Sequence, residues 1–200
     1  MITSNLPLTT IGWVAIAIGI VGLLALLAII LFFTIGQPFG TINDYLICLT
    51  AILSGVLVWV LYPEHHVQSP IVSQVLLIAA LIGAIVVVIG SVLSISGKTY
   101  FYLSGMYMAA GYAMIGLWLI GINYSALSGN PWPYSLIIFG LVSGVILVLG
   151  LVTIPDIFRG TDTNEYIFST FNSIWFTGFL GSLVLYPIWC ILLGYNLLLN

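Results

Sequence analysis

PYSLIIFGLVSGVILVLGLVTIP at residues 133–155 and WFTGFLGSLVLYPIWCILLGYNLLL at residues 175–199 decide the fold of this chain. Each apolar segment is long enough to cross the hydrocarbon core of a bilayer, which takes roughly 20 helical residues at ~1.5 Å per residue. Residues 155–168 carry four of the seven charged residues, Asp156, Arg159, Asp162 and Glu165. The pattern predicts two membrane-spanning helices joined by a polar loop.

The composition of the whole chain agrees with that prediction. Hydrophobic residues make up 62% of the chain and charged residues 4%, whereas a soluble domain has about 25% charged residues. The lipid bilayer is therefore the expected surrounding. Lys98 and Arg159 are the two basic residues, so no row of cations exists to bind nucleic acid through its phosphates.

Four more apolar segments precede these two, and we predict an all-α, polytopic integral membrane protein with six transmembrane helices in one bundle. Residues 1–200 form a single domain in this prediction. Asn43 or Asp44 is expected to cap the second span, and Pro70 to begin the third. The fourth span is rich in small residues and is expected to be the most buried. The expected spans are residues 11–35, 43–61, 71–95, 102–122, 136–154 and 170–199.

Small residues at helical spacing are the main packing signal, because they let helix backbones approach closely in lipid. The expected packing residues are Ala109, Ala113, Gly140, Gly144, Gly178 and Gly181. Similar pairs occur at Ala15 and Gly19, Ala79 and Gly83, and Gly90 and Ser94. A six-helix bundle needs fewer such faces, so we expect one of them to meet another membrane subunit or a second copy of this chain.

His65 and His66 are the two histidines and the one candidate cofactor site. Neutral imidazole is a common metal ligand, so the pair is a candidate for binding haem or chlorophyll at the membrane boundary. The alternative is a polar loop between Pro63 and Pro70. We predict no metal site, because an isolated histidine pair lacks the ligands of a complete one. An absorption spectrum of the purified protein distinguishes the two interpretations.

The apolar cores of the six expected spans contain no Asp, Glu, Lys, Arg or His, which argues against ion-coupled transport and intramembrane proteolysis. We therefore predict that the protein is not an enzyme. Uncharged polar residues do lie at depth, and they either hydrogen-bond between helices or line a path for a small solute. They are Thr50, Ser54, Ser91, Asn123, Ser143, Asn172 and Thr177.

Two motifs give a resemblance to a family. Trp132-Pro133-Tyr134-Ser135 precedes Gly140 and Gly144, and the last span carries Pro187, Trp189, Leu193, Gly194 and Leu197. Both motifs resemble uncharacterised bacterial six-helix membrane proteins of a domain-of-unknown-function family. The first motif lacks the basic residue of that family and has Ser135 to Phe139 in place of its Leu-Gly-Trp. The resemblance implies a six-helix bundle in a bacterial cytoplasmic membrane, with no assigned catalytic residues.

The sequence thus favours a non-enzymatic membrane protein that is a structural or accessory subunit of a larger assembly. The alternative is a small transporter, channel or ligand-sensing bundle with an uncharged pathway. A haem- or chlorophyll-binding subunit is the third interpretation.

The positive-inside rule predicts the orientation, because Lys98 and Arg159 lie on the same side of a six-span chain. We expect their loops in the cytoplasm and both termini outside. A membrane-impermeant thiol reagent added to intact cells should label His66→Cys and leave Lys98→Cys unlabelled, after Cys48 and Cys190 have been replaced. The opposite labelling would reverse the orientation.

Overall fold

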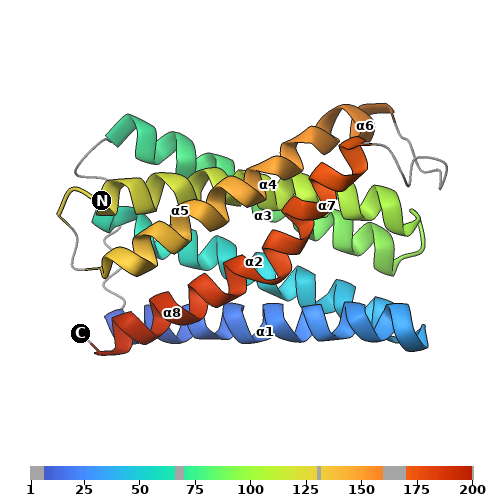
Figure 1. Ribbon diagram of the computed structural model, residues 1–200, viewed down its shortest axis with the longest axis horizontal. Coiled ribbons are helices and arrows are strands. Elements are labelled where there is room, and N and C mark those ends of the chain that lie inside the picture. The colour runs from blue at the N-terminus through green and yellow to red at the C-terminus, as the bar shows by residue number, and fades with distance from the viewer. Residues whose placement is uncertain (1–6, 66–69, 130–131, 160–169, 200) are drawn as a thin grey trace.

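The computed structural model describes residues 7–65, 70–129, 132–159 and 170–199. It is all-α, and its six apolar helical spans pack in one bundle, as predicted (Figure 1). Each span is long and apolar enough to cross a membrane. The protein is therefore a multi-pass membrane protein by the length and composition of its helices.

Four of the spans are single helices: α1 (Leu8–Ile35), α2 (Phe39–His65), α3 (Pro70–Ile95) and α4 (Phe101–Ala126). The fifth span consists of α5 (Tyr134–Val148), the 3₁₀ turn η1 (Leu149–Thr153) and α6 (Ile154–Arg159). The sixth consists of α7 (Thr170–Leu183) and α8 (Leu185–Leu199). The first and last described helices begin and end at the same end of the bundle (Figure 1).

The start of α2 differs from the prediction. The helix begins at Phe39, so Asn43 and Asp44 lie inside it and do not cap it. The Asn43 side-chain amide donates to the Ala25 carbonyl of α1 at 2.8 Å, and Ser94 Oγ of α3 donates to Asp44 Oδ2 at 2.6 Å. Both bonds join helices, and the backbone N–H groups of Phe39 and Ile42 donate to the carbonyls of Gly36 and Pro38. The prediction that Asn43 or Asp44 caps the second span was therefore wrong.

The fourth span is the most buried, as predicted. About 72% of the apolar stretch of α4 is buried, against 39 to 56% of the stretches in the other spans. Two close contacts explain this. A β-carbon placed on Gly83 of α3 would lie 2.5 Å from the Gly111 carbonyl oxygen of α4, and one placed on Gly111 would lie equally close to the Gly83 carbonyl oxygen. For Gly116 of α4 and Gly144 of α5, the distance from the added β-carbon to the other residue's carbonyl oxygen is 2.9 Å. The helix backbones touch at both places.

The sixth span is broken between Leu183 and Leu185, and its two halves pack against different helices. In Figure 1, α8 runs beside α1 and α7 crosses toward α6. Pro187 has no N–H to bond the Leu183 carbonyl, and its ring lies against Gly22 of α1. On the other side of the break, a β-carbon on Gly178 of α7 would lie 2.8 Å from the Gly150 nitrogen of η1.

Exposed tryptophans and tyrosines lie near the ends of the helices, where aromatic side chains suit a membrane interface. Trp13, Trp59 and Tyr195 are exposed at the end of the bundle that carries the termini. Trp132 shortly precedes α5, but it is only 6% exposed. Its ring packs edge-on against Trp189 with the centroids 6.3 Å apart, so it belongs to the interior.

The glycine contacts make a prediction about stability. Gly111→Ala should lower the free energy of unfolding by about 1–3 kcal/mol, because the new methyl group meets the Gly83 backbone, which has no room to yield. The measurement is thermal unfolding in mild detergent, followed by circular dichroism.

Gly55→Ala on α2 is the matched control, since its nearest neighbour is the Ala84 β-carbon at 3.6 Å, an ordinary contact. This change should be neutral or stabilising, because alanine has the higher helix propensity. Equal melting of the two variants would contradict the close-contact explanation.

Candidate functional site

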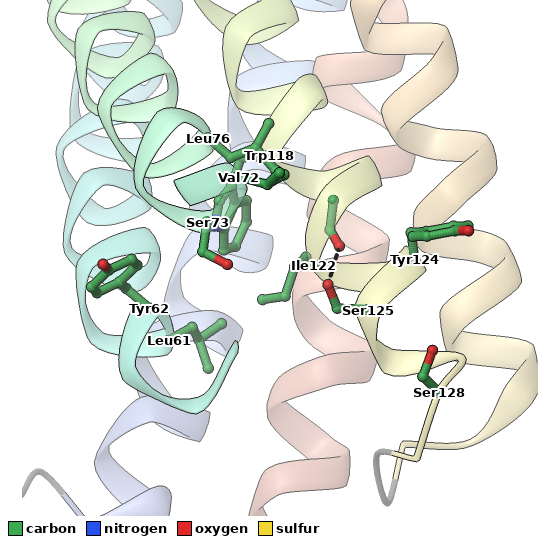
Figure 2. Close-up of a pocket in the computed structure, with 11 residues that line it drawn as sticks. Leu61, Tyr62, Val72, Ser73, Leu76, Trp118, Ile122, Tyr124, Ser125 and Ser128 are labelled. Carbon is green, nitrogen blue, oxygen red and sulfur yellow. Dashed lines mark hydrogen bonds between the residues drawn. The ribbon is translucent and has the colours of Figure 1, made fainter. Parts of the chain in front are cut away.

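A pocket of about 600 Å³ opens between α2, α3 and α4 at the end of the bundle that carries the termini, and we call it the end pocket. Figure 2 shows α2 and α3 on one side of it and α4 on the other. Its apolar lining residues are Leu61, Val72, Leu76, Trp118, Gly121 and Ile122. Its hydroxyl-bearing lining residues are Tyr62, Ser73, Tyr124, Ser125 and Ser128.

The polarity of the end pocket changes with depth. Ser73 lies in the first turn of α3, Ser125 lies in the last turn of α4, and Ser128 follows that helix. Trp118 lies about 12 Å farther in along α4 than its last residue, at 1.5 Å per residue. The hydroxyl groups therefore lie toward the mouth, together with Leu61 and Val72, whereas Trp118 and Leu76 lie deeper. The Ser125 hydroxyl donates to the Gly121 carbonyl of its own helix at 2.9 Å (Figure 2).

Among the side chains that the structure describes, those that line the end pocket include no Asp, Glu, Lys, Arg, His or Cys. An ion entering it would lose hydration without gaining a partner of opposite charge, which is strongly unfavourable. An uncharged molecule avoids that penalty. The volume falls within the ~300–1,000 Å³ of small-molecule sites, which are mostly apolar with a few polar groups.

The inner end of the end pocket is closed by a cluster of aromatic rings. Trp118 meets Trp189 of α8 edge-on with the centroids 6.3 Å apart, and Trp189 stacks on Tyr186 at an interplanar angle of 16°. Tyr186 also contacts Tyr112 of α4. Trp189 and Tyr186 are fully buried. These rings fill the middle of the bundle, so the end pocket does not continue through it.

One hydrogen bond joins this aromatic cluster to α2. The Tyr186 hydroxyl donates to Ser54 Oγ at 2.9 Å, and Ser54 Oγ donates to the Thr50 carbonyl of its own helix at 2.7 Å. The Trp189 indole nitrogen is buried without a hydrogen-bond partner among the described residues. The cluster is therefore held by ring packing and a single polar contact between helices.

Three of the polar residues predicted at depth form hydrogen bonds within their own helices. Thr50, Asn123 and Ser143 donate to carbonyls four residues earlier in their own helices. All three are at most 1% exposed. Such bonds satisfy a polar group inside its own helix and reach no solute. Ser54 also accepts a bond from Tyr186 of α8, and Ser91 Oγ is buried without a hydrogen-bond partner among the described residues. The Asn172 side chain lies outside the described part.

The predicted packing residues lie away from the end pocket, at the contacts among α4, the fifth span and α7. A β-carbon on Gly140 would clash with the Asn123 side chain, and Gly144 meets Gly116. Gly181 lies against Ile146 of α5. Ala109, Ala113 and Gly178 surround Gly150 of η1.

The predicted cofactor residues are not brought into a described site. His65 is the last residue of α2, while its side chain and the whole of His66 lie outside the described part. Within residues 7–65, 70–129, 132–159 and 170–199, no group of three His, Cys, Asp or Glu residues could hold a metal ion. Cys48 and Cys190 are free thiols.

Sequence reasoning did not find the end pocket. Its serines lie in or beside apolar segments, where a residue that faces a cavity has the same pattern as one that faces a neighbouring helix. The fourth span, rich in small and aromatic residues, and the Pro-x-Trp motif at Pro187 and Trp189 were the available signals, and both point to the aromatic cluster.

No protein-family model, curated protein or solved structure matches this chain. The resemblance to uncharacterised bacterial six-helix proteins thus stays a prediction. The site has to be interpreted from its own geometry and chemistry.

Proposed function

We propose that this protein is a non-enzymatic membrane protein that binds an uncharged amphipathic molecule in the end pocket. The observation that carries the proposal is the polarity gradient, with hydroxyl groups at the mouth and Trp118, Leu76 and Ile122 inside. A neutral polar group at the mouth and a hydrocarbon portion inside match that gradient. A monoacylglycerol has this chemistry.

The end pocket suits a sensor or carrier better than an open channel. The rings of Trp118, Trp189 and Tyr186 close its inner end, and the buried polar side chains mostly bond within their own helices. A conducting pore needs a continuous polar or hydrated path. Binding of a molecule at one face of the membrane fits this geometry better than conduction across the membrane.

The chemistry of the end pocket also supports a protein without enzymatic activity. General acid–base catalysis needs a titratable group within reach of the reacting atoms. The polar groups of the described lining are phenol and aliphatic hydroxyl groups, and none of the described lining residues is a base that could activate a serine. Binding is the task that these side chains can perform.

A photoactivatable monoacylglycerol tests the proposal in lipid nanodiscs. After illumination it should cross-link to Leu76 and Ile122, as located by peptide mass spectrometry. The corresponding fatty acid, which is anionic, should cross-link several-fold less at these positions, because the end pocket offers no cation. Equal labelling by both probes would contradict the selection for uncharged molecules.

A pair of variants on α3 serves as the control for this experiment. Ser73→Phe fills the end pocket and should remove the cross-links. Val75→Phe adds the same bulk at a position that is 60% exposed and does not line the end pocket, and it should leave them unchanged.

A second candidate function is a subunit of a larger membrane assembly. The glycines of the predicted small-residue pairs already contact other helices of the same chain. These contacts weaken the argument that the pairs bind a partner helix. One groove favours it still: Ala51, Gly55 and Ala84 lie in an apolar groove of about 380 Å³ on the outer face of α2 and α3. Small residues there leave space for another helix.

Native mass spectrometry from nanodiscs tests this candidate. If the groove binds a partner helix, the parent should appear as an assembly. Gly55→Leu should dissociate it, while Val56→Leu, at a neighbouring exposed position, should not. A 21.6 kDa monomer under all conditions would reject the assembly.

A further inference from the structure

The inner end of the end pocket is formed by side chains from two different helices. Trp118 of α4 is 4% exposed, and its ring packs edge-on against Trp189. Leu76 of α3 is only partly buried and packs against the hydrophobic core. Both line the end pocket, and Figure 2 shows them at the opposite end from Ser128. The inner wall therefore consists of an aromatic ring that is locked in place and an aliphatic side chain that is less enclosed.

Gly121 of α4 provides the space that Leu76 occupies. A β-carbon placed on Gly121 would clash with Leu76 Cδ1, and the next two atoms that it would meet also belong to the Leu76 side chain, at 3.5 and 3.9 Å. This glycine therefore differs from Gly83 and Gly111, which bring two backbones into contact. It forms a recess in α4 against which Leu76 lies. A larger residue at this position would push Leu76 away from α4 and into the end pocket.

Beyond Leu76, α3 and α4 come together and close the end pocket. Ala80, one turn farther in on the same face of α3, is fully buried. A β-carbon on Gly83 would lie 2.5 Å from the Gly111 carbonyl oxygen and 2.8 Å from Met114 Cβ of α4. The two helices are in contact at this level, so Leu76 marks the inner limit of the end pocket between them.

The apolar part of the end pocket is short compared with a lipid chain. At ~1.5 Å per residue, Trp118 lies about 12 Å from the last residue of α4, and Leu76 lies about 9 Å from the first residue of α3. These depths include the mouth with its hydroxyl groups. One leaflet takes up about 15 Å, half of the ~30 Å hydrocarbon core of a bilayer. A chain that fills a leaflet is therefore longer than the apolar part of the end pocket.

We propose that Leu76 and Gly121 set the length of the hydrocarbon chain that the end pocket accepts, and that its ligand is an uncharged amphipathic molecule with one chain of medium length. The inference rests on the proposed function for the chemistry of the ligand, and it adds the selection by length. A chain that reaches Leu76 buries its apolar surface while its polar group stays at the mouth. A longer chain pushes the polar group out beyond the mouth or displaces Leu76, and both lower the affinity.

A series of unlabelled monoacylglycerols of increasing chain length tests the selection. Each competes with the photoactivatable monoacylglycerol in nanodiscs, and cross-linking at Ile122 is measured by peptide mass spectrometry. On the parent protein, one medium chain length should displace the probe best. Leu76→Ala should move this optimum about two carbon atoms longer, because the change removes most of a side chain from the inner end. The longer chain should then compete about tenfold better than the chain that the parent prefers.

Gly121→Ala should have the opposite effect. Its methyl group displaces Leu76 toward the end pocket, so the optimum should become shorter by about one or two carbon atoms. The variant should still fold, which circular dichroism checks, because the methyl group meets the end of a side chain and not another backbone. When Gly121→Ala is combined with Leu76→Ala, the side chain that the methyl group displaces is gone. The double variant should therefore have the long optimum of Leu76→Ala.

Val72→Ala is the matched control, because Val72 lines the same pocket but lies toward the mouth and is 54% exposed. It should change competition by all chain lengths alike and leave the optimum where it is. An optimum that stays unchanged in both Leu76→Ala and Gly121→Ala, or that shifts equally in Val72→Ala, would overturn the inference and leave the proposed function standing. Absence of competition at every chain length would reject the proposed function, and the inference with it.

Discussion

Contact between glycine backbones is the interaction on which the rest of this structure depends. In a bilayer the lipid tails are as apolar as the side chains, so burial of hydrophobic surface does not drive helices together. Close packing and weak Cα–H···O contacts have to do so. Gly83 with Gly111 and Gly116 with Gly144 place α4 against two neighbours at once, which explains why the central helix is the one richest in small residues.

Where glycine contacts are missing, side chains have to fill the space, and they do so unevenly. Between α4 and α8, large rings fill the middle of the bundle, and between α2 and α3 small residues leave a groove at Gly55. Near the mouth of the end pocket, Ser73 of α3 and Ser125 of α4 have short side chains that do not fill the space between the helix ends. The end pocket thus lies where no contact between glycine backbones brings the described helix ends together.

Much of the fold was predictable from the sequence, because the length and apolar character of the spans are local properties. The six spans and the burial of α4 follow from composition alone. The inward position of Trp132 and the bonds of Asn43 and Asp44 could not be predicted from composition, since each depends on a helix that is distant in sequence. The end pocket was unpredictable for the same reason: it depends on how three helix ends diverge, and serine at the end of a span has no distinctive pattern.

The aromatic cluster brings polar groups into the interior that aliphatic side chains would not. The Trp189 indole N–H is buried without a partner among the described residues, and an unpaired buried donor costs about 1–3 kcal/mol. A leucine would fill space there without that penalty. Tyr186 likewise introduces a buried hydroxyl group, which donates to Ser54 Oγ. The rings therefore fill the space between α4 and α8 at a cost in hydrogen bonding, at a place where none of the described glycines brings the two helix backbones into contact.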